Sequence, residues 1–239
     1  MTPAAGIRRH GVNAMSRSAR SLEELRTHTG LVLSQMVERH PCLASCQDDV
    51  REVISILLAS WRSGCRLLLC GNGGSAADCD HIVGELAKGF LLPRPLPLAD
   101  KSRLRLAGPE GELIACTLQG GLPAISLAAH PAFYTAYCND VEAEFAFAQQ
   151  VYVHGRPGDC LLAISTSGES RNVLLAAITA KSFGLRVAAL TGCRGGAISR
   201  LADASIRVPA ESTAEVQELH IIVYHTICAA IEAEWFSPR

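Results

Sequence analysis

Residues 66–75 read Arg-Leu-Leu-Leu-Cys-Gly-Asn-Gly-Gly-Ser, and this stretch decides the fold. Its apolar run ends at a glycine, which is typical of a short strand buried on both faces of a parallel sheet. The glycines that follow permit positive φ angles and a close approach of the backbone to a ligand. A helix that begins near Ser75 would offer unpaired N–H groups and the positive end of its dipole, which favour an anion. The glycine spacing matches neither a dinucleotide-binding fingerprint nor a P-loop, and a tight turn that binds nothing is the alternative.

Four further apolar runs resemble the first and cover residues 124–128, 160–164, 187–190 and 205–208. Stretches with helical periodicity lie between or after them, at 142–153, 172–183, 197–201 and 212–235. Alternating strands and helices imply right-handed crossovers and a parallel sheet that is covered on both faces. The sequence therefore predicts an α/β fold, a three-layer sandwich with a five-stranded parallel sheet flanked by helices.

The regions outside this alternation define the domain organisation. Two helical patterns, at 21–40 and 42–63, precede the first strand, and the first of them opens with a capping signal at Ser21. Residues 1–20 are predicted to form a flexible arm, because no apolar stretch of a secretory signal follows their arginines. Residues 91–122 are rich in proline and glycine and interrupt the rhythm, so they are predicted to be an insertion with a short helix near 112–118. Residues 21–239 thus form one domain.

Composition excludes several classes of protein. The 239 residues are 49% hydrophobic and 19% charged, and the net charge is −1. No field of one sign exists to attract nucleic acid or an anionic membrane, and the apolar runs are too short to span a bilayer. The ten cysteines include no Cys-x-x-Cys pair and fall largely in predicted strands and helices. They are interpreted as reduced thiols, which predicts a cytoplasmic protein.

A loop with four hydroxyl side chains follows the third predicted strand, and these belong to Ser165, Thr166, Ser167 and Ser170. Several hydroxyls beside Gly168 can bond the oxygens of one phosphate together. The alternative is a cluster of helix caps, but capping requires one hydroxyl. This loop and the glycine loop both follow parallel strands, where open α/β sheets bind their ligands.

Ionisable side chains recur at helical spacing on two predicted helices. His81 and Glu85 are four residues apart and share one face. Gln217 and His225 lie along one stripe of the last helix, whereas His220 points well round that helix and is not expected to face the same site. A lone His or Glu on a helix is usually exposed to solvent, or is buried with its hydrogen bonds satisfied. Charged groups in apolar settings are costly unless they are paired or functional, which makes this set a candidate site.

From about residue 45 to the C-terminus, the chain resembles the sugar isomerase (SIS) domain family. The motifs that carry the resemblance are Gly-Asn-Gly-Gly-Ser-Ala-Ala-Asp at 71–78 with His81 and Glu85, Asn139-Asp140, the loop at 165–170, and Gln217-Glu218-x-His220 ending at His225. The serine loop alone indicates an SIS domain. The other motifs narrow the resemblance to the phosphoheptose isomerases, which convert sedoheptulose 7-phosphate to glycero-manno-heptose 7-phosphate.

The resemblance implies a role for each matching position. Glu85 would be the general base and His225 the general acid. The phosphate would be held by Ser165, Thr166, Ser167 and Ser170. Further substrate contacts would come from Asn72, Gly73, Gly74, Ser75, Glu85, Asn139, Asp140 and Gln217. Some relatives bind zinc through the positions of His81, Glu85, Gln217 and His225, so Zn²⁺ is an expected cofactor. The family is typically a homotetramer whose sites are shared between subunits, and the N-terminal helices are expected to serve this assembly.

Two other functions are compatible with the same motifs. One is an SIS isomerase that acts on another sugar phosphate, such as arabinose 5-phosphate or an amino-sugar phosphate. The other is a non-catalytic SIS module of the kind that binds the replication initiator protein as a tetramer. The presence of both Glu85 and His225 favours the enzyme, because a scaffold has no need of this pair.

Overall fold

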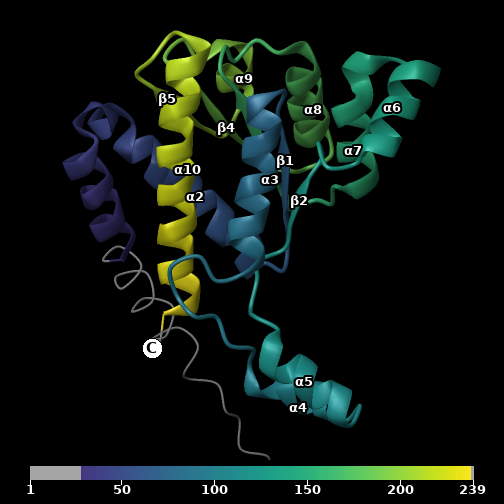
Figure 1. Cartoon of the computed structure of the whole chain (residues 1–239). Helices are drawn as coiled ribbons and strands as arrows, with labels where there is room; N and C mark the ends of the chain where they lie inside the picture. The colour runs from purple at the N-terminus through teal and green to yellow at the C-terminus, as the bar shows by residue number, and fades with distance from the viewer. Residues whose placement is uncertain (1–27, 238–239) are drawn as a thin grey trace, which may run out of the picture.

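A five-stranded, wholly parallel sheet forms the centre of the protein (Figure 1), as the sequence predicts. The computed structural model describes residues 28–237, so the predicted arm at 1–20 lies outside the described residues. The strand order is β2-β1-β3-β4-β5. The strands are β1 (Leu67–Cys70), β2 (Ala124–Ser126), β3 (Cys160–Ser165), β4 (Arg186–Gly192) and β5 (Ala204–Val208). Strand β2 lies on one side of β1, and β3 lies on the other side. The carboxyl ends of β1 and β3 are therefore next to each other.

Helices cover both faces of the sheet and complete the three layers. One face carries α2 (Gln47–Arg62), α3 (Gly74–Ala87) and α10 (Thr213–Phe236), and the other carries α7 (Ala146–His154), α8 (Arg171–Ser182) and α9 (Gly196–Leu201). Leu67 and Leu69 of β1 belong to the first apolar cluster, whereas Leu68 and Cys70 belong to the second. This alternation is the two-residue period of a strand, and it explains why the run is apolar throughout.

The N-terminal part packs on the side of α10. Residues 28–39 form one helix, and the short helix η1 (Pro41–Cys46) connects it to α2. Leu33 and Met36 of the first helix are buried in the same apolar cluster as α2 and α10. The helix predicted at 21–40 is therefore present over its described part. No helix among residues 28–237 combines the length and the apolar character needed to cross a membrane.

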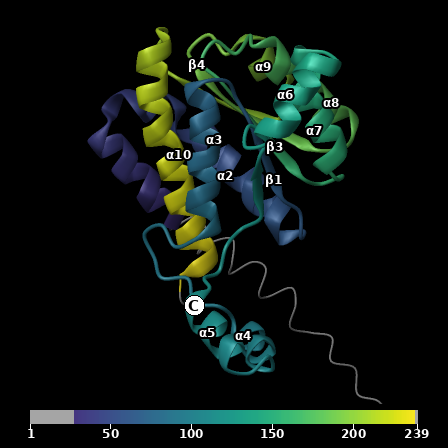
Figure 2. The same cartoon turned by 45° about the vertical axis from the view of Figure 1, so that its right-hand side comes forward.

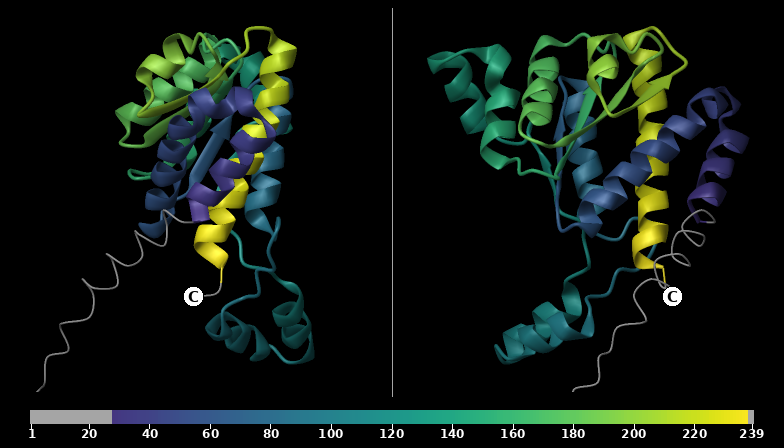
Figure 3. Two further views of the ribbon diagram at one scale, coloured as in Figure 1. Left: turned by 90° about the vertical axis from the view of Figure 1, so that its left-hand side faces the viewer. Right: turned by 180° about the vertical axis from the view of Figure 1, so that it is seen from behind.

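The segment expected to be an insertion contains more helix than the sequence predicted. It holds α4 (Leu98–Arg105) and α5 (Pro109–Thr117), which pack on each other and project from the end of the molecule where α3 and α10 finish (Figures 2 and 3). The expected helix at 112–118 is thus the second half of α5. No apolar periodicity marks α4, because none of its residues is buried.

A further helix was not predicted from the sequence. It is α6 (Pro131–Asp140), which begins with a proline in its first turn and is followed by the short helix η2 (Ala143–Phe145). No residue of α6 is fully buried, so its apolar residues do not form the stripe that identifies a surface helix. Figures 1 and 3 place α6 beyond α7, on the opposite side of the molecule from α10.

Candidate functional site

The glycine loop joins β1 to α3 at the carboxyl edge of the sheet. Gly73 has a φ of +55°, which favours glycine. The amide of Gln217 from α10 lies against Gly74, so a Cβ at this position would require the Gln217 side chain to move. Ser75 is buried and its N–H donates to the carbonyl of Asn72. The loop is therefore a tightly built start of α3, with the open N–H groups of a helix N-terminus at its edge.

The serine loop at the end of β3 has its hydroxyls close together. Ser165 Oγ lies 2.9 Å from Ser170 Oγ and also accepts the N–H of Gly168 at 3.2 Å. Ser167 Oγ accepts the N–H of Glu169 at 3.1 Å. Thr166 and Ser167 line a cavity of about 670 Å³ together with two exposed ion pairs, Arg194 with Glu211 and Arg200 with Glu169. The hydroxyls can bind an anion such as phosphate, whereas each of the two arginines already has a carboxylate partner.

An amide pair that the sequence analysis missed joins the two loops. Asn72 Nδ2 donates to Asn172 Oδ1 at 2.9 Å, and Asn172 Nδ2 donates to Asn72 Oδ1 at 2.8 Å. Asn172 stands in the first turn of α8, 100 residues along the chain. The pair links the glycine loop to the first turn of α8, which directly follows the serine loop.

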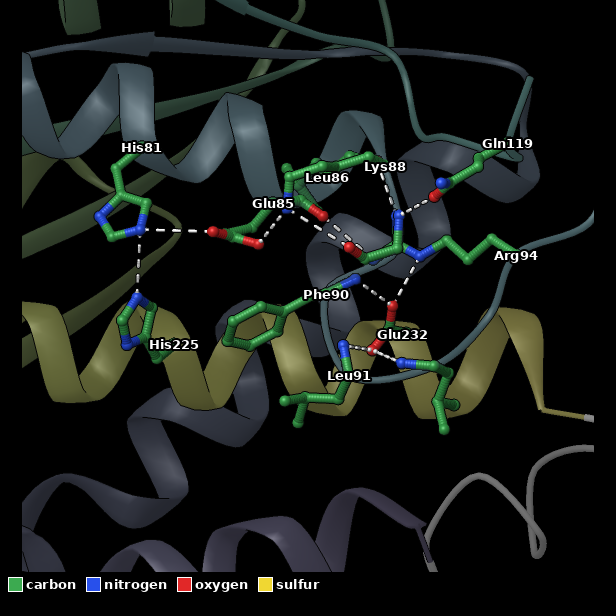
Figure 4. A network of polar contacts seen from close by, with 12 residues as sticks. His81, Glu85, Leu86, Lys88, Phe90, Leu91, Arg94, Gln119, His225 and Glu232 are labelled. Carbon is green, nitrogen blue, oxygen red and sulfur yellow. Dashed lines mark hydrogen bonds and ion pairs between the residues drawn. The ribbon is translucent and has the colours of Figure 1, made fainter. Parts of the chain in front are cut away.

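Three ionisable side chains from α3 and α10 converge on one point (Figure 4). His81 Nε2 lies 3.4 Å from Glu85 Oε1 and 3.4 Å from His225 Nε2. The other carboxylate oxygen of Glu85 contacts Lys88 Nζ at 3.2 Å. The Glu85 side chain is 13% exposed, whereas that of His81 is 41% exposed, so the carboxylate is largely covered beside an open imidazole. A base and an imidazole within reach of one ligand are the elements of acid–base catalysis.

The orientation of His81 is set by Tyr224, another residue that the sequence analysis missed. The Tyr224 hydroxyl lies 2.9 Å from His81 Nδ1, which leaves Nε2 directed at Glu85 and His225. Burial and the nearby carboxylate of Asp78 raise the pKa of Tyr224, so the hydroxyl keeps its proton at neutral pH. A partner on Nδ1 fixes the ring and selects the nitrogen that faces a ligand.

Burial, and then the neighbouring His81, lowers the pKa of His225, although Glu85 acts in the opposite direction. The neutral imidazole is therefore the main form at neutral pH. A neutral imidazole can still donate an N–H hydrogen bond to a substrate oxygen or receive a proton from it. It is also the form that binds metal ions.

His220 is separate from this site, as its position on α10 predicts. The ring is fully buried, and neither nitrogen has a hydrogen-bond partner among residues 28–237. Burial lowers its pKa to about 4. His220 therefore faces the core as a neutral side chain, while His225 faces His81.

The three converging side chains are also potential ligands of a metal ion. Within residues 28–237, no group of three or more His, Cys, Asp or Glu side chains has the arrangement of a metal centre. The donor atoms of His81, Glu85 and His225 are nevertheless spaced 3.4 Å apart in the two pairs given above. Two ligands of one tetrahedral zinc, each about 2.0–2.1 Å from the ion, lie roughly 3.3 Å apart. The donor chemistry and these two distances match pairs of zinc ligands, although the three residues do not form a complete metal centre in this chain.

Several predicted site residues lie away from this point. Gln217 contacts Gly74 at the start of α3. His81 comes seven residues after Gly74, which corresponds to about 10 Å along the helix. Asn139 and Asp140 end α6, where Asn139 Nδ2 donates to Asp140 Oδ1 at 2.8 Å and both side chains are exposed. In a single chain, the structure thus brings together three members of the predicted metal set and leaves Asn139 and Asp140 apart.

A mainly apolar groove of about 320 Å³ opens beside His225. It lies between the helix at 28–39, α10 and the segment after α3, and its apolar lining includes Val32, Met36, Phe90, Leu91 and Ile222. The ring of Phe90 lies 5.4 Å from that of His225. The site therefore continues across the surface of α10 toward the N-terminal helix.

Comparison with known proteins agrees with this architecture. A model of the SIS domain family matches residues 123–233. The phosphoheptose isomerase of Rhodospirillum rubrum is 36% identical over 190 residues, which cover 80% of this chain and 88% of that protein. The phosphoheptose isomerase of Mycobacterium tuberculosis is 36% identical over 222 residues, which cover 93% of this chain and 98% of that protein. The solved structure of the phosphoheptose isomerase of Neisseria gonorrhoeae has a TM-score of 0.64 and 29% identity, and the match covers 92% of this chain and 98% of that one. The chain therefore belongs to the phosphoheptose isomerase family of SIS-domain proteins.

Proposed function

We propose that this chain is an aldose–ketose isomerase that converts sedoheptulose 7-phosphate to D-glycero-D-manno-heptose 7-phosphate. The observation that carries the proposal is that His81, Glu85 and His225 converge between α3 and α10. The first turns of these two helices lie beside the proposed phosphate-binding loops. The phosphoheptose isomerase relatives support it.

The reaction moves a proton between two neighbouring carbons of the open-chain sugar. The Glu85 carboxylate takes a proton from C1 of the ketose while a hydrogen bond from His225 stabilises the negative charge that develops on the C2 oxygen. The resulting enediolate then loses the proton of its C1 hydroxyl, and protons are added at C2 and at the C2 oxygen, which leaves an aldehyde at C1 and a hydroxyl at C2. The sugar gains and loses the same number of protons, so no oxidant or reductant is required.

The distance between the two halves of the site suits a long sugar. Phosphate oxygens would bind to the serine loop and to the N–H groups at the start of α3. The proton-transfer groups begin at His81, about 10 Å further along the same helix. A heptose 7-phosphate carries its phosphate at the far end of seven carbons from C1. Such a chain spans this distance more readily than a pentose phosphate, and phosphate binding would then position C1 and C2.

The two other functions are less well supported. An SIS isomerase for a shorter sugar phosphate would use the same acid–base groups, but the spacing along α3 favours the longer substrate. A non-catalytic module would require only the surface of the fold. The covered carboxylate of Glu85, 13% exposed and facing two imidazoles, has no evident purpose in a scaffold.

Zinc is proposed as the cofactor, with His81, Glu85 and His225 as ligands and Gln217 as the fourth. When bound, the ion would polarise the substrate carbonyl and stabilise negative charge on its oxygen. Tyr224 supports this assignment, because its contact with Nδ1 of His81 leaves Nε2 available as a ligand. The amide of Gln217 would have to turn from Gly74 toward His225, and Gln is an uncommon zinc ligand.

We also propose a homotetramer in the cytoplasm, with sites shared between subunits. The apolar groove beside His225, the exposed Leu31 on the N-terminal helix and the separation of Asn139 and Asp140 from α10 support an assembly that completes the site. The ten unpaired thiols support a reducing compartment. Light scattering at micromolar concentration should give four times the subunit mass of 25.4 kDa. A monomer mass would be incompatible with the assembly.

A substrate panel tests the proposed reaction. The purified protein is incubated with sedoheptulose 7-phosphate, fructose 6-phosphate and ribulose 5-phosphate, and aldose formation is followed by NMR. We expect the highest kcat/KM for the heptulose. A clear preference for the pentulose would show that the protein is an isomerase with a different substrate. If no ketose phosphate is converted, the non-catalytic module is favoured.

A further inference from the structure

Arg94 and Glu232 form an ion pair almost wholly inside the protein. Each side chain is 1% exposed, and Arg94 Nε lies 2.7 Å from Glu232 Oε1. The removal of two charges from water is costly, and a well-packed apolar pair often gives equal or greater stability at such positions. The reason for charged residues at this place must therefore lie in the contacts that their side chains make.

Arg94 binds the last turn of α3. Its Nη1 donates to the carbonyl of Leu86 at 2.9 Å, and its Nη2 donates to the carbonyl of Glu85 at 3.0 Å (Figure 4). Carbonyls in the last turn of a helix have no partner within the helix, and a cation suits the negative end of the dipole. Arg94 thus fixes the backbone turn that carries the proposed catalytic base.

Glu232 binds the segment that leaves α3. Its carboxylate accepts three successive N–H groups, from Phe90 at 2.8 Å, Leu91 at 2.6 Å and Leu92 at 2.9 Å. Burial alone would raise the pKa of Glu232, but these N–H groups and Arg94 outweigh it, so the pKa is lowered and the group stays charged at neutral pH. This network places the ring of Phe90 5.4 Å from the ring of His225.

The pair also links the two helices that carry the proton-transfer groups. Glu232 comes seven residues after His225 on α10, which is two turns later on the same face. Arg94 joins that face to the turn of Glu85. One buried pair therefore connects the backbone positions of the proposed base and acid, although neither of its members reaches the point where His81, Glu85 and His225 meet.

We infer that Arg94 and Glu232 are positioning residues that hold Glu85 and His225 at the spacing needed for proton transfer. The inference rests on the proposed isomerase function. Displacement of a reacting group by about 1 Å can lower a rate by roughly 100-fold without removing any catalytic group. A change to the pair should therefore lower kcat more than it changes KM, because the phosphate loops lie at the opposite end of α3.

The double variant Arg94→Met/Glu232→Leu tests this assignment. Both charges are removed together, so no uncompensated charge is left inside the protein, but the backbone groups that the pair binds lose these partners, and circular dichroism must therefore show that the variant is folded. We expect kcat for sedoheptulose 7-phosphate to fall about 10- to 100-fold while KM stays within about 3-fold of the wild-type value. If the pair only stabilises the fold, the folded double variant should have the kcat of the wild type, and that result would overturn the inference.

A second variant decides the matter if the double variant does not fold. Arg94→Lys keeps a positive charge for Glu232, but an ammonium lacks the planar fork that reaches both carbonyls at once. We expect a smaller fall in kcat, again with little change in KM, and an Arg94→Lys protein with wild-type kcat would contradict the assignment.

The matched control is Arg105→Met/Glu112→Leu, which makes the same replacements in the exposed ion pair of the α4–α5 hairpin. Its kcat should equal that of the wild type. If the wild type converts no ketose phosphate, the proposed function fails. If the wild type is active and the Arg94 variants are equally active, only the positioning role fails.

Discussion

Glu85→Gln is expected to lower kcat for sedoheptulose 7-phosphate by about 10²- to 10⁴-fold, the usual contribution of a general base. Gln keeps the size of the side chain but cannot accept a proton from carbon. The fold should persist, because Glu85 contacts His81 and Lys88 and is no member of either apolar cluster of the core. The measurement is steady-state kinetics beside far-ultraviolet circular dichroism and a binding assay with the sugar phosphate.

The control for this variant is Glu52→Gln, the same substitution at an exposed position of α2. It should leave kcat and KM unchanged. If purified and folded Glu85→Gln protein turns over at nearly the wild-type rate, Glu85 is not the base, and another group must remove the proton.

Removal of metal is expected to have the second large effect. Dialysis against a chelator should lower turnover by at least about 10-fold, and added Zn²⁺ should restore it, because the ion would stabilise charge on the substrate oxygen. The melting temperature should change far less. The core consists of two apolar clusters on the two faces of the sheet, and the folded state does not depend on the proposed ligands.

Elemental analysis gives this experiment a readout that is independent of activity. The active protein should contain close to one zinc per subunit, and a His81→Ala/His225→Ala variant should contain almost none. Full turnover in protein shown to be free of metal would leave proton transfer by Glu85 and His225 without any ion.

The sheet was predictable because its signal is local. Each strand is a short apolar run that ends at a turn, so the five runs at 66–70, 124–128, 160–164, 187–190 and 205–208 sufficed to identify β1 to β5. The helices α4 and α6 were not predictable in this way, because neither has a buried residue and therefore neither shows an apolar stripe.

The candidate site was predictable only where its residues share a helix or a known motif. His81 and Glu85 are four residues apart, so their common face follows from helical geometry. Their contact with His225 depends on the packing of α3 against α10, for which the motif resemblance was the only guide. That resemblance also grouped Asn139 and Asp140 with the site, and a single chain leaves them apart from it.

The contacts that support the site were not predicted, because they join residues that are far apart in the sequence. Arg94 and Glu232 are 138 residues apart, and Asn72 and Asn172 are 100 residues apart. Nothing near Arg94 in the sequence distinguishes it from a surface arginine in a proline-rich segment. Its burial results from the path of the chain between α3 and α4, which only the folded structure reveals.

The proposed isomerase moves a proton between C1 and C2 of sedoheptulose 7-phosphate, and NMR spectroscopy in D₂O can follow this transfer. The wild-type protein is incubated with the sugar phosphate in D₂O, and the carbon-bound protons at C1 and C2 are followed over time. We expect formation of the aldose together with deuterium at C2, because the proton taken up by Glu85 can exchange with solvent before it is returned. An unchanged spectrum, with neither aldose nor deuterium incorporation at any protein concentration, would show that the protein does not catalyse this isomerisation.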